Sequence, residues 1–243
     1  MRKRLAWTLA LGFCAGCTML APSGAGSVPL ANSPASDTPS EIHAEPAPPN
    51  KDTLQQASDC LERGDEAGAV RRLNEYVEAN PSHALVRAHL AELLIRQDRR
   101  AEAKRQFIAY VELAQQQGEP ADRHLLLSHT RLAEIARDDG DAFAEHLHRG
   151  IGLWLLARQV QKLPDPGDDS PDPQPLLFKA VRELKKAAAI RDDDARPHWY
   201  LNQVWSDLGQ HHPAAQSLRR ASESASLTDL TSAERLSISL ESK

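Results

Sequence analysis

The chain has 243 residues, of which 29 are basic and 34 acidic, and its formal net charge is −5. This acidic balance argues against nucleic acid as a partner, because binding to phosphates needs a concentrated positive surface. Aromatic residues make up 5% of the chain, and Ala, Leu, Arg, Glu and Gln dominate after residue 50. These residue types favour helices, so we expect an all-α fold.

The first residues have the pattern of a secretory leader. Arg2, Lys3 and Arg4 form a positive start, and an apolar stretch follows from Leu5 to Phe13. That stretch is too short to cross about 30 Å of hydrocarbon comfortably. We therefore expect residues 1–16 to be a signal peptide.

The end of this leader, Cys14-Ala15-Gly16-Cys17, resembles the lipobox of bacterial lipoproteins, although Cys14 stands where that motif usually has Leu. The resemblance implies that Cys17 is acylated and becomes a membrane anchor, because several buried acyl chains hold a protein firmly. Thr18 rather than Asp after the cysteine implies the outer membrane, with the protein facing the periplasm. The alternative is an unlipidated secreted or periplasmic protein.

After the anchor, residues 17–50 are rich in Pro, Ser and Ala and poor in branched apolar residues. Such a composition cannot bury a core, so we expect a disordered tether. Residues 51–243 are predicted to form one helical repeat domain.

That domain shows a 34-residue period. Aligning residues 50–83 with 84–117 pairs small with small and large with large side chains. The pairs are Ala57 with Ala91, Cys60 with Leu94, Ala67 with Ala101, Ala69 with Ala103, Leu73 with Phe107, Tyr76 with Tyr110, Val77 with Val111 and Glu78 with Glu112. A second pair of segments repeats at the same spacing, with Ala180, Leu184 and Ala187 before Ala214, Leu218 and Ala221, and Lys185-Lys186 before Arg219-Arg220.

This spacing and residue choice resemble the tetratricopeptide repeat (TPR), a helix-turn-helix unit. The resemblance implies a right-handed superhelical solenoid of antiparallel helix pairs, with about four to five units. Gly64 and Asp98 are expected at the turns inside the first two units. A capping box, Thr231 to Glu234, predicts a last helix over residues 233–240 that covers the end of the array.

Two features are expected to interrupt the array. Gly150 and Gly152 are predicted to divide the helical stretch from Asp141 to Lys162, so that its second half begins a further unit. Residues 164–175 contain five prolines and four acidic residues, and we expect them to form an exposed loop that is neither helix nor strand.

The sequence offers no catalytic motif. His146 and His148 are two residues apart and cannot share a helix face, and His124 and His129 are five apart. Cys60 aligns with Leu94, which favours a buried side chain over a redox thiol. We therefore predict no catalytic residue, no metal site and no cofactor.

In TPR proteins, peptides bind the concave surface formed by the first helix of each unit. Carrying those positions over by register gives a candidate surface for a protein or peptide partner. It consists of Leu85, Ala88, Glu92, Ile95, Arg96, Thr130, Glu134, Arg137, Trp199 and Gln203.

These features predict an envelope-anchored scaffold for protein–protein interaction rather than an enzyme. One alternative is a lipoprotein assembly factor or pilotin for a pilus or an outer-membrane machine. Another is a helical accessory subunit of a cell-wall enzyme.

Overall fold

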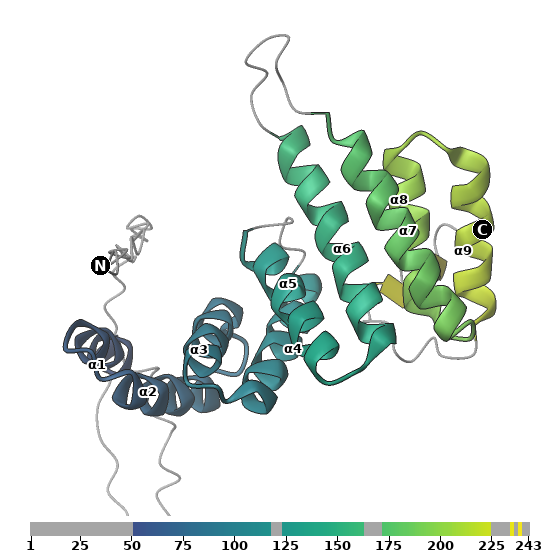
Figure 1. Cartoon of the computed structure of the whole chain (residues 1–243). Coiled ribbons are helices and arrows are strands. Elements are labelled where there is room, and N and C mark those ends of the chain that lie inside the picture. The colour runs from purple at the N-terminus through teal and green to yellow at the C-terminus, as the bar shows by residue number, and fades with distance from the viewer. Residues whose placement is uncertain (1–50, 118–122, 163–171, 225–233, 236–237, 240–243) are drawn as a thin grey trace, which may run out of the picture. The chain divides into compact units, whose positions relative to one another are not determined.

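The computed structural model describes residues 51–117, 123–162, 172–224, 234–235 and 238–239. Within these residues there are nine helices and no strand (Figure 1). The helices are α1 (Lys51–Glu62), α2 (Glu66–Ala79), α3 (Ala84–Arg96), α4 (Arg100–Gln116), α5 (Arg123–Asp138), α6 (Ala142–Gln161), α7 (Gln174–Ile190), α8 (Ala195–Asp207) and α9 (His211–Glu223). All of them belong to one compact unit, Pro46–Lys243.

Four helix pairs are joined by the same tight turn. Each turn has one residue with positive φ, and the next residue donates its N–H to the carbonyl five positions back, which closes a helix C-terminus. The positive-φ residues are Gly64 (77°), Asp98 (57°), Gly140 (75°) and Gly209 (69°). The closing bonds are Asp65 to Cys60, Arg99 to Leu94, Asp141 to Ala136 and Gln210 to Trp205, at 2.8 to 2.9 Å. The turns predicted at Gly64 and Asp98 are confirmed.

The helices stack in chain order. α1 packs on α2, α2 on α3, and so on to α9, so that each pair buries its apolar stripe against the next. Short turns between helices in contact make the partners antiparallel. The prediction of an all-α solenoid of antiparallel helix pairs is confirmed, with four turn-linked pairs and one additional helix, α7, in the described part of the chain.

Positions 34 residues apart have the same environment in the first two pairs. Ala69 and Ala103, at the crossing of the two helices, are both fully buried. Leu73 and its counterpart Phe107 are buried as well, and both belong to one cluster contributed by α1 to α5. The repeat register is therefore correct. Small residues let the helices approach closely, and the large side chains fill the seam between units.

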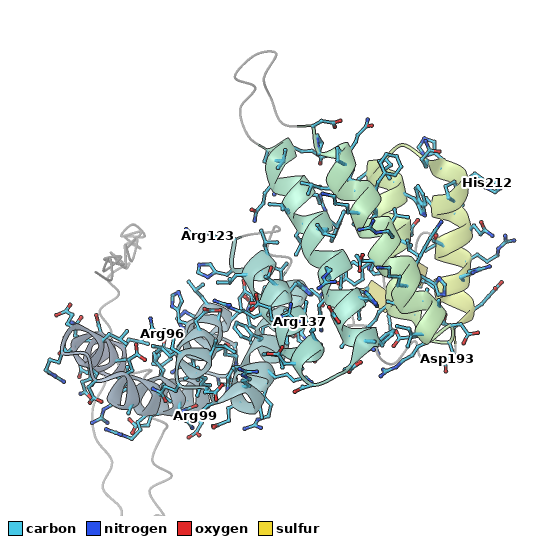
Figure 2. The ribbon with its side chains drawn as sticks, viewed as in Figure 1. Arg96, Arg99, Arg123, Arg137, Asp193 and His212 are labelled. Carbon is cyan, nitrogen blue, oxygen red and sulfur yellow. The ribbon has the colours of Figure 1, made fainter. Side chains whose placement is uncertain are left out.

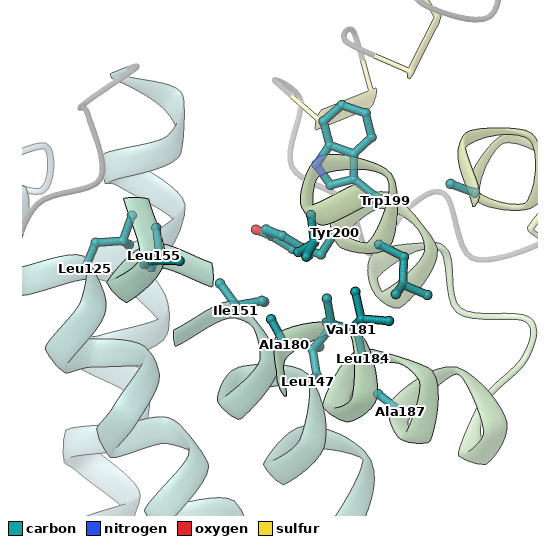
Figure 3. Packing of buried hydrophobic residues seen from close by; sticks show 14 of the residues in the cluster. Leu125, Leu147, Ile151, Leu155, Ala180, Val181, Leu184, Ala187, Trp199 and Tyr200 are labelled. Atoms are coloured by element: carbon teal, nitrogen blue, oxygen red, sulfur yellow. The ribbon is translucent and has the colours of Figure 1, made fainter. Parts of the chain in front are cut away.

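A second cluster runs from α3 to α9 and is densest around α6, α7 and α8. Leu147, Ile151 and Leu155 of α6 belong to this cluster together with Leu184 of α7 and Tyr200 of α8, and Leu155 lies towards Leu125 of α5 (Figure 3). Since buried apolar area is the main favourable term in folding, this cluster contributes to holding α6, α7 and α8 together.

The predicted break at Gly150 and Gly152 is wrong. α6 continues through both glycines as one helix of 20 residues, and it packs on α5, α7 and α8. Gly150 serves the approach of α7, because a Cβ atom there would lie 2.7 Å from Leu184 Cγ and 3.2 Å from the Leu184 backbone nitrogen. A glycine needed for close contact between helices is hard to distinguish in a sequence from one that breaks a helix.

The predicted loop at residues 164–175 is too long at its end. α7 begins at Gln174 and has Pro175 in its first turn, where a missing N–H costs no helical hydrogen bond. Residues 163–171 lie outside the described residues. The described part of the predicted helix at 233–240 is helical, with Glu234 and Ile238 buried.

A search of the described residues finds no helix with the length and apolar character needed to cross a membrane. Cys17, the signal peptide predicted at residues 1–16 and the tether predicted at 17–50 lie outside those residues.

Candidate functional site

The ten side chains predicted to bind a ligand lie on α3, α5 and α8, but they are not equally accessible. Leu85, Arg96, Thr130 and Arg137 are exposed, and Glu92, Ile95, Glu134 and Gln203 are half-buried. The side chains of Arg96 and Arg137 can be followed in Figure 2. Ala88 is 4% exposed and Trp199 7% exposed, and both belong to the second cluster. The expectation that these two side chains lie on an open surface is corrected, because both pack in the core.

Among the remaining positions, Glu92 and Glu134 are held together by Arg131. Arg131 Nε lies 3.1 Å from Glu92 Oε1, and Arg131 Nη1 lies 2.9 Å from Glu134 Oε2. The two carboxylates and their hydrogen bonds raise the pKa of Arg131. Arg131 therefore links α3 to α5 and neutralises the carboxylates of Glu92 and Glu134 on the predicted surface. Its role was not predicted, because an arginine on α5 gives no local sign of a carboxylate 39 residues earlier.

A different surface offers a groove, which we call the α7–α9 groove. It has a volume of about 910 Å³ and is lined by Lys185, Ala188, Ala189, Asp192, Asp193, His198, Leu201, Trp205, Pro213, Gln216, Ser217, Arg220, Glu223 and Ser224. α7 and α9 form its walls and α8 its floor. Asp193 lies at the turn between α7 and α8 (Figure 2).

The floor of the α7–α9 groove is apolar, whereas its rim carries charges of both signs. Leu201 is buried and Trp205 half-buried, and the Lys185 ammonium lies 5.4 Å from the centroid of the Trp205 ring. That contact holds a cation over an aromatic face. Arg220 lies on the opposite wall. Burial lowers the pKa of His198, and the positive charge of Arg220 lowers it as well, so the groove floor stays uncharged at neutral pH.

One repeated feature of the sequence relates to this groove, although it was not used to choose the candidate binding residues. Lys185-Lys186 on α7 and Arg219-Arg220 on α9 recur 34 residues apart. Equivalent positions of stacked helices lie on the same side of an array, so basic residues there border a common groove. The predicted binding residues came from the first helices of units, whereas the walls of the α7–α9 groove come from α7 and from α9, the second helix of the last pair.

One further group of polar side chains surrounds Glu183 of α7, which is 3% exposed and lies 2.8 Å from His146 Nδ1 and 3.1 Å from Lys186 Nζ. The Lys186 ammonium compensates its carboxylate, as a buried charge requires. Within the described residues, no group of three His, Cys, Asp or Glu side chains is arranged to hold a metal ion. Cys60 is buried, as its alignment with Leu94 predicted.

Comparison with known proteins gives limited similarity. No family model matches the chain, and no curated protein matches it. A crystal structure of MamA protein shares 15% identity, covers 71% of this chain and 89% of its own, and has a TM-score of 0.37. MamA from Desulfovibrio magneticus RS-1 shares 16% identity over 74% of this chain and 97% of its own, with a TM-score of 0.32.

TTC0263, a thermophilic TPR protein in Thermus thermophilus, shares 17% identity. The alignment covers 78% of this chain and 97% of that protein, with a TM-score of 0.36. Identities and TM-scores this low do not allow the function of these proteins to be assigned to this chain. The arrangement of helix pairs described above is what makes this chain a TPR-like helical repeat protein.

Proposed function

We propose that this chain is a non-catalytic scaffold that binds a peptide segment of a partner protein in the α7–α9 groove. The observation that carries the proposal is the groove itself, with an apolar floor at Leu201 and Trp205 between charged walls. A ligand suited to it has an apolar anchor for Trp205 and flanking charges that complement Lys185, Asp192 or Arg220.

Photo-crosslinking in cells that express the chain tests this function. A photoreactive amino acid replaces Gln216 inside the groove, and a matched variant carries it at the exposed Arg72 on α2. We expect one reproducible partner from position 216 and none of it from position 72. The same partner should be lost when Trp205→Ala is added. Equal capture from both positions, or capture that ignores Trp205→Ala, would reject the groove as the binding site.

We further propose that Cys17 anchors the scaffold to the outer membrane, with the domain facing the periplasm. The support is the lipobox-like sequence Cys14-Ala15-Gly16-Cys17 after a positive and then apolar leader. Residues 17–50 would then act as a spacer. As a flexible chain they would reach roughly 30–35 Å from the membrane.

Membrane fractionation of the Cys17→Ala variant tests the anchor. The wild-type chain should sediment with membranes and release acylated fragments on digestion. The Cys17→Ala variant should appear in the soluble fraction with an unchanged circular dichroism spectrum. Equal membrane association of both chains would contradict the anchor and leave the scaffold function unaffected.

A further inference from the structure

The exposed face of α7, which forms one wall of the α7–α9 groove, carries positive charge and no exposed carboxylate. Its basic side chains are Lys179, Arg182, Lys185 and Lys186, and all four are exposed. We call these four residues the α7 basic face. Glu183 is the only acidic residue of α7, and it is 3% exposed. Because the whole chain has a net charge of −5, this positive surface is a local feature that favours a negatively charged ligand.

The protein itself balances little of this charge. The Glu183 carboxylate lies 3.1 Å from Lys186 Nζ and 3.4 Å from Arg182 Nε, so one negative charge is shared by two cations of the α7 basic face. Within the described residues, neither Lys179 nor Lys185 forms an ion pair. The α7 basic face therefore keeps positive charge with which a bound carboxylate can pair.

The acidic residues of the groove lie at one end of it, near the turn between α7 and α8. Asp192 and Asp193 follow the last residue of α7, and Figure 2 shows Asp193 at this turn. At 1.5 Å per residue, Asp192 lies about 10 Å from Lys185 along the helix axis. Glu223 ends α9, which is parallel to α7 because short turns make both helices antiparallel to α8, so it lies at the same end. Arg220 offsets only part of this negative charge.

An exposed apolar side chain lies on α7, on the side away from the acidic end. Phe178 is 54% exposed, more than any other large apolar residue in the described part of the chain. Phe178 and Lys185 are seven residues apart, so they lie on one face of the helix. The Lys185 ammonium in turn lies 5.4 Å from the centroid of the Trp205 ring. A ligand along this wall meets positive and apolar groups together, which suits an acidic segment that also contains apolar residues.

The shape of the site favours a polypeptide segment over a flat anionic surface. The groove has a volume of about 910 Å³, and Leu201 and Trp205 lie between its two helical walls. A membrane surface can contact the exposed face of α7, but it cannot reach a floor between two helices. A side chain of a bound peptide can enter such a concave site.

We propose that the segment bound in the α7–α9 groove is acidic, with carboxylates that pair with the α7 basic face and an apolar side chain that contacts Trp205. Its acidic stretch lies along α7 from Lys185 towards Phe178, because Asp192 and Asp193 repel it at the other end. This inference rests on the proposed function and adds the chemical class of the partner segment. The α7 basic face selects the charge of the ligand and Trp205 holds its apolar residue, so the two contributions can be measured separately.

Fluorescence anisotropy with synthetic peptides tests the class of ligand. The first probe is a fluorescein-labelled peptide in which glutamates and serines flank a single leucine, and the matched probe has lysines in place of the glutamates. We expect the full wild-type chain to bind the glutamate probe at least tenfold more tightly than the lysine probe, with an affinity that falls as the salt concentration rises. Equal binding of the two probes, tighter binding of the lysine probe, or no binding of the glutamate probe would overturn the proposal.

Charge reversal on α7 tests the site. Lys179→Glu combined with Lys185→Glu should weaken binding of the glutamate probe at least tenfold, and circular dichroism should show an unchanged helical fold, because both side chains are exposed. The control reverses two exposed arginines elsewhere, Arg71→Glu on α2 and Arg105→Glu on α4, so the net charge changes by the same amount. It should change the affinity less than twofold. Equal effects of the two double variants would mean that binding follows net charge alone, and the proposal would fail.

Trp205→Ala separates this inference from the function on which it rests. Binding of the glutamate probe that is lost in Trp205→Ala but kept after the charge reversal on α7 would retain the groove and overturn the acidic class. Binding that responds to the charge reversal but not to Trp205→Ala would place the probe outside the groove. That result would overturn this inference, while cross-linking from position 216 would still decide the proposed function.

Anionic vesicles distinguish a peptide from a lipid surface. The wild-type chain and the chain with the charge reversal on α7 are each sedimented with vesicles of phosphatidylcholine that contain a quarter of phosphatidylglycerol. We expect the same sedimentation for both chains. If the charge reversal lowers sedimentation, the α7 basic face binds lipid headgroups rather than a peptide, and the proposal is overturned.

Discussion

The imidazole Nδ1 atoms of His129 on α5 and His148 on α6 lie 3.1 Å apart, so the two rings share one hydrogen bond. One ring must donate and the other accept, which requires at least one neutral imidazole. Burial lowers the pKa of both residues, and together with the charges of Arg196 and Lys104 it brings the pKa of His148 to about 4. Asp141 acts in the opposite direction on His148.

This pair makes the fold sensitive to acid. In the unfolded chain each His binds a proton near pH 6.5, whereas folded His148 binds one near pH 4. Between these values the unfolded state holds more protons, so stability is fully present above pH 6.5 and falls as the pH drops towards 4. The shift from 6.5 to about 4 corresponds to about 3–4 kcal/mol at most.

Urea unfolding at pH 7 and pH 4.5 measures the effect. His148→Gln should lose less stability between these pH values than the wild type, because the titrating group is gone. Substitution of the exposed His212 by Gln is the control and should leave the wild-type pH dependence unchanged. A His148→Gln variant with the full acid sensitivity would reject the role of the pair.

The two glycines of α6 should respond oppositely to substitution by Ala. Gly150→Ala forces a Cβ atom against the backbone of α7, where overpacking costs about 1–3 kcal/mol. At Gly152 the nearest atom to a Cβ lies 3.9 Å away, so the better helix propensity of Ala should stabilise the protein by up to about 1 kcal/mol. Thermal or urea unfolding of both variants checks the sign. A shift in the same direction for both would contradict the packing described for α6 and α7.

Two neighbouring residues of α4 differ in burial, one lying in the core and the other on the surface. Phe107 is 1% exposed and Ile108 is 39% exposed. Phe107→Ala leaves a cavity between helix pairs and should cost about 3–5 kcal/mol, whereas Ile108→Ala should cost less than about 1 kcal/mol. The free energies of unfolding in urea compare the two variants directly. Similar losses would mean that the 34-residue register is misplaced.

The sequence predicted those parts of the fold that depend on local pattern. Ala69 and Ala103 recur at the helix crossings, and Gly64 and Asp98 at the turns, because each position of a repeat has its own steric requirement. The continuity of α6 could not be predicted in this way. It depends on the close approach of α7 at Leu184, which lies 34 residues away from Gly150.

The candidate site was harder to predict than the fold. Register alone placed Ala88 and Trp199 on an open surface, but stacking against neighbouring helices buries both of them. The carboxylate of Glu92 on α3 forms an ion pair with Arg131 on α5. Such contacts depend on how consecutive units are rotated, and a repeat pattern does not specify that rotation. The groove walls at Lys185 and Arg220 were visible as a repeated basic pair, but their relation to Trp205 required the structure.

We expect the binding of a partner protein in the α7–α9 groove to depend on Trp205, and the affinity of that partner for purified variants measures this dependence. Titration calorimetry would compare the wild-type chain with Trp205→Ala, and with Leu156→Ala as a control at an exposed apolar residue outside the groove. We predict that Trp205→Ala raises the dissociation constant at least tenfold while Leu156→Ala changes it less than twofold. Equal affinities for the wild type and a correctly folded Trp205→Ala variant would contradict the claim.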